Sequence, residues 1–228
     1  MHRHHLARFS VFGFLGILGP AVQADTAGNP RDLLADKTLS GWELITATPT
    51  ALDAVCNPGA DGVLAIAGKP VGYLATRASY GNYQLHFEWR WPADAGKGSN
   101  GGVLLHISSG PAGGTAWPVC FQAQLKIGRA GDLLPMASAR FAEKPTTAPE
   151  AKTPQLDRGG DSSEKPPGEW NVGEVLCHGN TIEVRINGVL QNRVSQCAPA
   201  SGKIGFQLEG SPFELRHVQI QADTPFQK

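Results

Sequence analysis

The sequence contains few of the features that mark the common enzyme and nucleic-acid-binding classes. Basic and acidic side chains are equal in number, 20 of each in 228 residues, which gives no charge excess for binding nucleic acid. No CxxC pair and no His/Cys spacing indicates a zinc site. The motifs G-x-S-x-G and E-x-D-x-x-E are both absent. Acyl transfer on an α/β-hydrolase fold and ordinary two-carboxylate glycoside hydrolysis therefore find little support.

Long apolar runs are missing after the N-terminal region. Residues 1–24 begin with Arg3 and Arg8, continue with the apolar run Phe9–Leu18 and end in small residues at Ala24, which predicts a secretory signal peptide. The run is shorter than the roughly 20 residues that span a bilayer, and a retained anchor is the alternative. Cleavage leaves residues 25–228, with 18 basic and 20 acidic side chains, as one domain. We expect secretion to the periplasm or cell envelope, with no membrane span in the mature chain.

Only four cysteines are present. An oxidising compartment would allow disulfides, and four cysteines can pair in three ways. Cys177 and Cys197 flank one hairpin region and are the favoured pair. The alternative is that Cys56, Cys120 and these two are small buried thiols.

Helical patterns are also scarce, and the chain contains 28 glycines and 17 prolines. Apolar and polar residues alternate in several segments, among them Tyr83–Trp91, and Asn187-Gly188 lies between two alternating runs as in a β-hairpin. Many short strands with turn residues between them predict an all-β sandwich or jelly roll. Residues 140–168 are polar, rich in proline and without periodicity, which indicates either a flap over a site or a surface loop.

One apparent nucleotide motif is rejected. Gly96, Gly98 and Gly101 form a G-x-G-x-x-G, but a strand-like segment follows them. Dinucleotide binding needs a helix N-terminus at that point.

Polar side chains repeat on one face of several predicted strands. Gln122 and Gln124 share one face, and so do Gln207 and Glu209. If these strands are neighbours, amide, carboxylate, imidazole and indole groups would meet on one surface suited to a sugar. A solvated outer face is the alternative, as it is for His86, Glu88 and Arg90. The remaining candidates for this surface are His106, Trp117 and Asp132.

Seven blocks between residues 32 and 220 resemble, in order, the 3-keto-disaccharide hydrolase domain family. They include "SNGGVLLHIS", "WPVCFQAQLKIGRAGD" and "GKIGFQLEGSPFELRHVQI". The resemblance implies a concanavalin A-like jelly-roll β-sandwich, secretion, and action on glycosides oxidised at the 3-position of the sugar. Residue by residue, Glu209, Gln124 and Asp132 match the pattern of that family. Our leading hypothesis takes Glu209 as the catalytic base or acid, assisted by His106. The sugar would be held by Gln122, Gln124, Asp132, Trp117, Asn100 and Gln207.

Two departures from the family pattern concern this site. Gln122 stands where the family commonly has Glu, and Gly101-Gly102 replaces an Asn-Ser-Gly ending so that Asn100 comes one place early. Loss of a carboxylate removes a candidate base or metal ligand.

The chemistry implied by the resemblance is C2 proton removal followed by β-elimination, or net hydrolysis after water addition. It needs no cofactor; a divalent ion would suit the enolate, but no ligand cluster demands one. A non-catalytic carbohydrate-binding module and an envelope scaffold protein are the alternatives.

Overall fold

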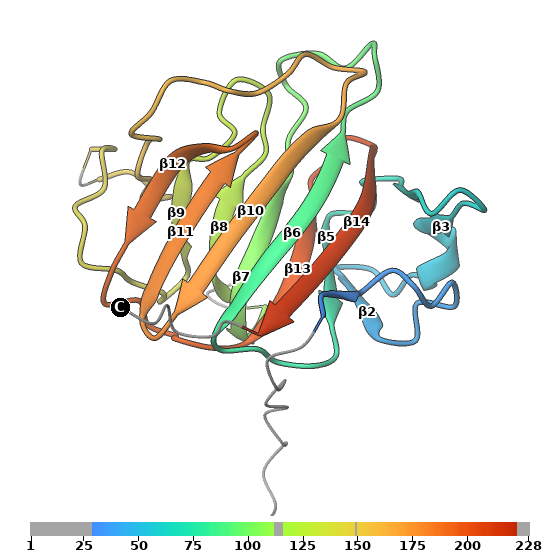
Figure 1. Ribbon diagram of the computed structural model, residues 1–228, viewed down its shortest axis with the longest axis horizontal. Coiled ribbons are helices and arrows are strands. Elements are labelled where there is room, and N and C mark those ends of the chain that lie inside the picture. The colour runs from blue at the N-terminus through green and yellow to red at the C-terminus, as the bar shows by residue number, and fades with distance from the viewer. Residues whose placement is uncertain (1–28, 112–115, 149, 223–228) are drawn as a thin grey trace, which may run out of the picture.

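The computed structural model describes residues 29–111, 116–148 and 150–222. The predicted signal peptide, residues 1–24, lies outside the described residues. The described chain forms two antiparallel sheets that face each other around a common core (Figure 1). The eight-stranded sheet is sheet A, and the six-stranded sheet is sheet B.

Sheet A has the strand order β12-β11-β10-β6-β14-β4-β3, and β1 also pairs with β14. Its strands are β1 (Arg31–Asp32), β3 (Cys56–Pro58), β4 (Leu64–Ile66), β6 (Tyr83–Arg90), β10 (Asn171–His178), β11 (Thr181–Ile186), β12 (Val189–Val194) and β14 (Phe213–Ala222). Sheet B has the order β2-β5-β13-β7-β8-β9. Its strands are β2 (Trp42–Thr46), β5 (Gly72–Thr76), β7 (Gly102–Ser109), β8 (Val119–Gln124), β9 (Leu133–Met136) and β13 (Lys203–Leu208). A short 3₁₀ helix, η1 (Leu52–Ala54), precedes β3.

The alternation in β6 places one set of side chains between the sheets. Leu85, Phe87 and Trp89 are buried, while the residues between them face outward. The Phe87 ring meets Phe206 of β13 edge to face, with 5.6 Å between the centroids. Side chains at alternate positions of a strand lie on opposite faces, so burial of one set fixes the orientation of the other. The predicted all-β sandwich is confirmed.

The predicted hairpin at Asn187-Gly188 is also confirmed, because these two residues connect β11 to β12. Their φ angles are 49° and 80°, both in the left-handed region. A two-residue turn of this kind matches the twist of the paired strands, and Asn and Gly tolerate positive φ at little steric cost.

The proline-rich segment 140–168 contains no helix or strand in its described residues. Two backbone bridges are among the contacts that tie it to the sandwich. Leu156 forms a bridge with Leu133 of β9, the edge strand of sheet B, and Arg140 forms one with Ala198. The segment therefore covers an edge that would otherwise expose unpaired backbone groups.

A second apolar cluster lies on the outward face of sheet B. It includes Tyr73, Leu104, Cys120, Leu134 and Met136, all of them buried. Sheet B is therefore apolar on much of both faces, which leaves few positions on it for polar side chains.

The favoured Cys177–Cys197 disulfide is wrong in this structure, where all four cysteine side chains are buried thiols. Strand β11 lies between β10, which carries Cys177, and β12, which leads to Cys197. Cys177 lies at hydrogen-bonding range of the Tyr83 hydroxyl, and Cys197 lies at the backbone of Ile182. Burial raises the pKa of the Cys56 and Cys197 thiols to about 12, which disfavours the reactive thiolate.

The prediction that His106 faces outward with the glutamines is wrong. The register of β7 shifts between Leu105 and Ser109 against β8, and His106 has a φ of 54°. This β-bulge turns the imidazole into the core, where it meets Tyr83 at 5.9 Å and Phe121 at 6.2 Å between ring centroids. Strand parity cannot anticipate a bulge, because the extra residue reverses the alternation.

His106 is a buried, neutral histidine in the fold. Its Nδ1 contacts the carbonyl oxygen of Pro199 at 3.2 Å, and Nε2 has no hydrogen-bond partner among the described residues. Desolvation lowers the pKa of His106 from 6.5 to about 4, although the bond to Pro199 acts in the opposite direction. At weakly acid pH, the His106 imidazole is therefore protonated in the unfolded chain and neutral in the folded chain.

Stability should depend on pH through this residue. Because the folded pKa is depressed, the stabilisation is complete above the unfolded pKa and is lost as the pH falls toward 4. A His106→Asn variant is the reference, because Asn tolerates positive φ but does not titrate. Between pH 7 and pH 5 the free energy of unfolding of the wild type should fall by about 2 kcal/mol more than that of this variant. Urea unfolding at both pH values measures the difference; equal losses would contradict a neutral, buried His106.

Candidate functional site

Three glutamines form a hydrogen-bonded cluster on the outward face of sheet B. Gln122 and Gln124 lie at the end of β8, and Gln207 lies on β13. Gln122 Nε2 donates to Gln207 Oε1 at 2.9 Å and to Gln124 Oε1 at 3.1 Å. All three are buried. The structure thus brings together the glutamines that strand parity placed on one surface.

Backbone contacts determine how the Gln124 amide is oriented. Its Oε1 also accepts hydrogen bonds from the N–H groups of Leu125 and Lys126, at 3.2 and 3.3 Å. The oxygen is therefore held in place, and Gln122 beside it must be a donor. Since one NH₂ group has two protons, Gln122 Nε2 uses both in the cluster.

In each glutamine, either the amide oxygen or the amide NH₂ group makes no hydrogen bond within the cluster. Among the described residues, no hydrogen bond is made by Gln122 Oε1, Gln124 Nε2 or Gln207 Nε2. The cluster therefore offers one acceptor and two NH₂ donors in a rigid arrangement, which suits the hydroxyl and carbonyl groups of a sugar.

Gly102 makes room for this cluster. It pairs with Gln124 across β7 and β8, and a Cβ atom at this position would lie 2.7 Å from Cγ of Gln122. Only glycine leaves the Gln122 side chain where it is. Gly102 thus has a packing role in the glutamine cluster.

Glu209 lies two residues beyond Gln207 on the same face and is half-buried. Asn100 Nδ2 donates to Glu209 Oε2 at 2.7 Å, and Asn100 Oδ1 accepts from the N–H of Gly101 at 3.0 Å. Burial raises the pKa of Glu209, and the charge of Lys126 and the bond from Asn100 only partly offset it. A carboxyl of this kind can exchange a proton nearer neutral pH than an exposed one.

Lys126 is a site residue that the sequence reasoning missed. Its ammonium group is near enough to Glu209 to lower the pKa of that carboxyl, and its own backbone N–H bonds Gln124. The pattern contained the information, because Lys126 continues the alternation of Gln122 and Gln124. Its side chain is only half-buried and can meet a ligand.

Asp132 has structural partners instead of a free carboxylate. It is fully buried, forms an ion pair with Arg129 at 2.6 Å and accepts hydrogen bonds from Gln155 Nε2 and the backbone N–H of Arg158. Burial raises its pKa despite these contacts. The carboxylate fastens residues 155–158 of the proline-rich segment to the β8–β9 hairpin.

Trp117 lies on the outward face of sheet B, which was predicted to bind a sugar, but at the other end of β8. It packs against the outward apolar cluster of sheet B that contains Cys120 and Met136. The glutamines occupy the opposite end of the strand. The structure therefore groups five of the predicted residues, namely Asn100, Gln122, Gln124, Gln207 and Glu209, and adds Lys126.

The described residues contain neither a metal-binding cluster nor a membrane-spanning helix. No three or more His, Cys, Asp or Glu side chains gather there in a way that could hold a metal ion. Within the same ranges, no helix has the length and apolar character needed to cross a membrane.

Several solved structures have a similar fold. A candidate glycosyl hydrolase from Parabacteroides distasonis ATCC 8503 aligns with a TM-score of 0.60 and 19% identity, over 86% of this chain and 100% of that chain. The carbohydrate-binding module CBM66 from Bacillus subtilis gives 0.56 and 9%, over 80% and 96%. The Bacillus licheniformis β-glucanase gives 0.52 and 11%, over 87% and 100%. At these identities the likeness shows the fold alone, which is the concanavalin A-like jelly roll.

Comparison with curated proteins gave no match. Residues 29–221, however, match the profile of the 3-keto-alpha-glucoside-1,2-lyase-like domain. The match extends over the whole sandwich, including every residue of the glutamine cluster, and it agrees with the resemblance found in the sequence. The chain therefore belongs to the 3-keto-alpha-glucoside-1,2-lyase-like domain family, a family of carbohydrate-active proteins.

Proposed function

We propose that the protein cleaves 3-keto-glycosides at the site formed by Glu209, Asn100, Lys126 and the glutamine cluster. The observation that carries the proposal is the half-buried Glu209 carboxyl, whose pKa is raised by burial beside an amide donor and a cation. Membership of a carbohydrate-active family supports the choice of a sugar substrate, and its name suggests a 3-keto-glycoside.

The reaction uses the acidity that a ketone at C3 confers on the C2 proton. Glu209 accepts that proton, and the electron pair of the C2–H bond forms an enolate with its negative charge on the C3 oxygen. The enolate then re-forms the ketone, a C1=C2 double bond forms, and the C1–O bond to the leaving group breaks. The leaving oxygen takes a proton from the Glu209 carboxylic acid. Addition of water across the double bond would complete a net hydrolysis.

The neighbours of Glu209 suit the other requirements of this reaction. Lys126 supplies positive charge close to the carboxylate and is available to a developing enolate. The free NH₂ groups of Gln124 and Gln207 and the free oxygen of Gln122 can bond the sugar hydroxyls. Because these amides are already held by one another, little entropy is lost when the sugar binds.

A non-catalytic sugar-binding role is the second candidate, and Gln122 is the observation that favours it. The family commonly has a carboxylate at this position, whereas here the environment requires a donor. A protein with the same fold and no second carboxylate could bind a sugar without cleaving it. An envelope scaffold role, which needs no sugar at all, is the third candidate.

Replacement of Glu209 separates these candidates. Glu209→Gln keeps the size and can still bond Asn100, but it cannot accept a proton; kcat on a 3-keto-disaccharide should fall at least about 100-fold with KM changed little. Release of free sugar is the measurement, and Glu169→Gln, an exposed carboxylate outside the site, is the matched control.

The outcomes are distinct. Binding of the 3-keto-disaccharide without turnover by the wild type would identify a binding module. Neither binding nor turnover would leave the scaffold role. Full activity in Glu209→Gln would place the base elsewhere.

The Gln122→Glu substitution should destabilise the protein. A carboxylate there would face the fixed Oε1 of Gln124 without a proton to donate, at a cost of about 1–3 kcal/mol in the free energy of unfolding. The loss should grow as the pH rises, because the introduced carboxyl fits its surroundings only when protonated. Urea unfolding at acid and neutral pH measures it. A variant as stable as wild type and more active would show that the natural protein has lost its chemistry.

We also propose that the protein is secreted, on the basis of residues 1–24. Expression of the full chain in a Gram-negative host should give a periplasmic protein that begins at Asp25. N-terminal mass spectrometry of the periplasmic and cytoplasmic fractions tests this; an intact N-terminus in the membrane fraction would indicate a retained anchor.

A further inference from the structure

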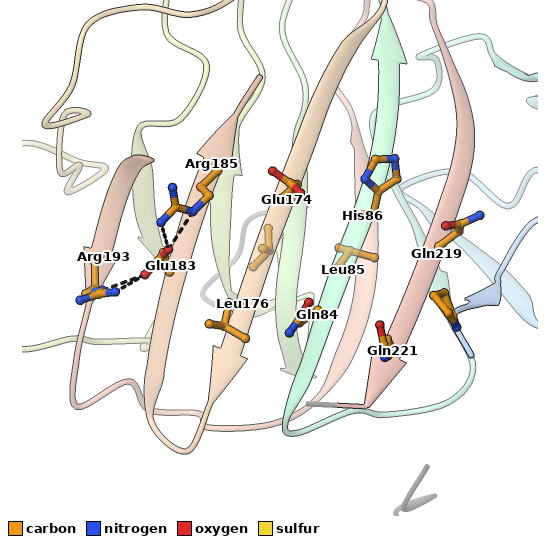
Figure 2. A pocket seen from close by; sticks show the side chains of 12 residues that line it. Gln84, Leu85, His86, Glu174, Leu176, Glu183, Arg185, Arg193, Gln219 and Gln221 are labelled. Atoms are coloured by element: carbon orange, nitrogen blue, oxygen red, sulfur yellow. Dashed lines mark hydrogen bonds and ion pairs between the residues drawn. The ribbon is translucent and has the colours of Figure 1, made fainter. Parts of the chain in front are cut away.

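The outward face of sheet A carries a groove of about 420 Å³ (Figure 2). It lies across the sandwich from the glutamine cluster, which is on the outward face of sheet B. His86, which the alternation places on the outward face of β6, is half-buried and lines this groove.

Two rows of side chains cross the strands at this groove. In the first row, Gln221 of β14 lies opposite Gln84 of β6, followed by Leu176 of β10, Glu183 of β11 and Arg193 of β12. The second row runs through Gln219, His86, Glu174 and Arg185. With neighbouring strands about 4.8 Å apart, the first row extends over roughly 19 Å. The groove therefore suits an extended ligand that lies across the strands.

The half of the groove over β6 and β14 offers unused amide groups. Gln84, Gln219 and Gln221 make no hydrogen bond with any described residue, and the exposed Glu174 has no ion pair there. Each amide presents both a donor and an acceptor. Figure 2 shows the three amides grouped around the strand that carries His86.

The other half of the groove is held rigid by an ion-pair network. Glu183 is only 8% exposed, and its two carboxylate oxygens accept hydrogen bonds from Arg185 and Arg193. Although burial acts to raise the pKa of Glu183, the two arginines outweigh it and lower the pKa. Both guanidinium groups are thereby held beside Glu183 at this end of the groove.

The composition of the groove narrows the class of ligand. Two arginines and two glutamates balance in charge, which gives no preference for nucleic acid or another polyanion. Four of its lining side chains carry charge, whereas charged residues are depleted in the core of a protein–protein interface. A neutral chain rich in hydroxyl groups matches such an array of amides, carboxylates and guanidinium groups.

We propose that this groove is a second carbohydrate-binding surface, which holds a neutral glycan chain across strands β14, β6, β10 and β11. It is independent of the Glu209 site and would hold a polymeric glycan while that site acts on or binds a chain end. The described residues that line the groove include no Trp, Tyr or Phe, so hydrogen bonds carry the binding and the dissociation constant should be in the millimolar range.

Titration with neutral glucan oligomers tests the proposal. Cellohexaose, laminarihexaose and maltohexaose are added to the mature protein, and the side-chain amide signals of Gln84, Gln219 and Gln221 are followed by NMR. At least one oligomer should shift these signals in a saturable way. The combined Gln84→Ala and Gln221→Ala variant should weaken binding about tenfold or more, because it removes two amide partners.

Two controls locate the binding. Glu209→Gln should leave the groove signals and their affinity unchanged, whatever it does to activity. Glu174→Gln keeps the shape and removes one charge, and Glu169→Gln is its matched control outside the groove. A loss of binding in Glu209→Gln but not in the groove variant would assign the ligand to sheet B and overturn the proposal. If none of the three oligomers shifts the amide signals, the proposal is also overturned. The same holds if the wild type forms a dimer that the groove variant abolishes, because the groove would then be a subunit interface.

Discussion

Contact between the inner faces of sheets A and B holds the molecule together, and the edge-to-face pair Phe87–Phe206 is one of its contacts between the sheets. Once these rings are buried, the residues next to them in each strand must point to the outward face, because side chains alternate between the two faces. His86 must face outward from sheet A, and Gln207 must face outward from sheet B. Burial of apolar side chains thus places both polar surfaces described here, although neither contributes to the core.

The glutamine cluster shows how one altered residue can fit its surroundings and change the chemistry. Gln124 Oε1 is held by two backbone N–H groups, so position 122 must donate, and Gln122 does. Gly102 leaves the space that this side chain occupies. Relative to the family pattern, the site exchanges a carboxylate for a fixed donor and keeps Glu209 as its titratable group. Proton transfer, if it occurs at this site, depends on one carboxyl rather than two.

The two outward faces of the sandwich differ in what they can do. On sheet B, a half-buried carboxyl and the cation of Lys126 lie next to prearranged amides, an arrangement that suits reaction at one sugar unit. On sheet A, amides and ion-paired arginines extend across several strands without such a carboxyl–cation pair, which suits holding a chain. In these two proposals, the groove on sheet A binds a glycan chain and the site on sheet B acts on one sugar unit. Binding at the groove would then keep a chain end close to Glu209.

The sequence by itself determined the sheet architecture, because alternation and the Asn187-Gly188 turn are local and read directly as strands and hairpins. It also predicted which glutamines share a face with Glu209. It could not predict that His106 turns inward, since a bulge depends on the neighbouring strands. The influence of the Lys126 charge on the Glu209 carboxyl and the groove that includes His86 were likewise decided by tertiary structure, because strands distant in sequence meet only when the sheets assemble.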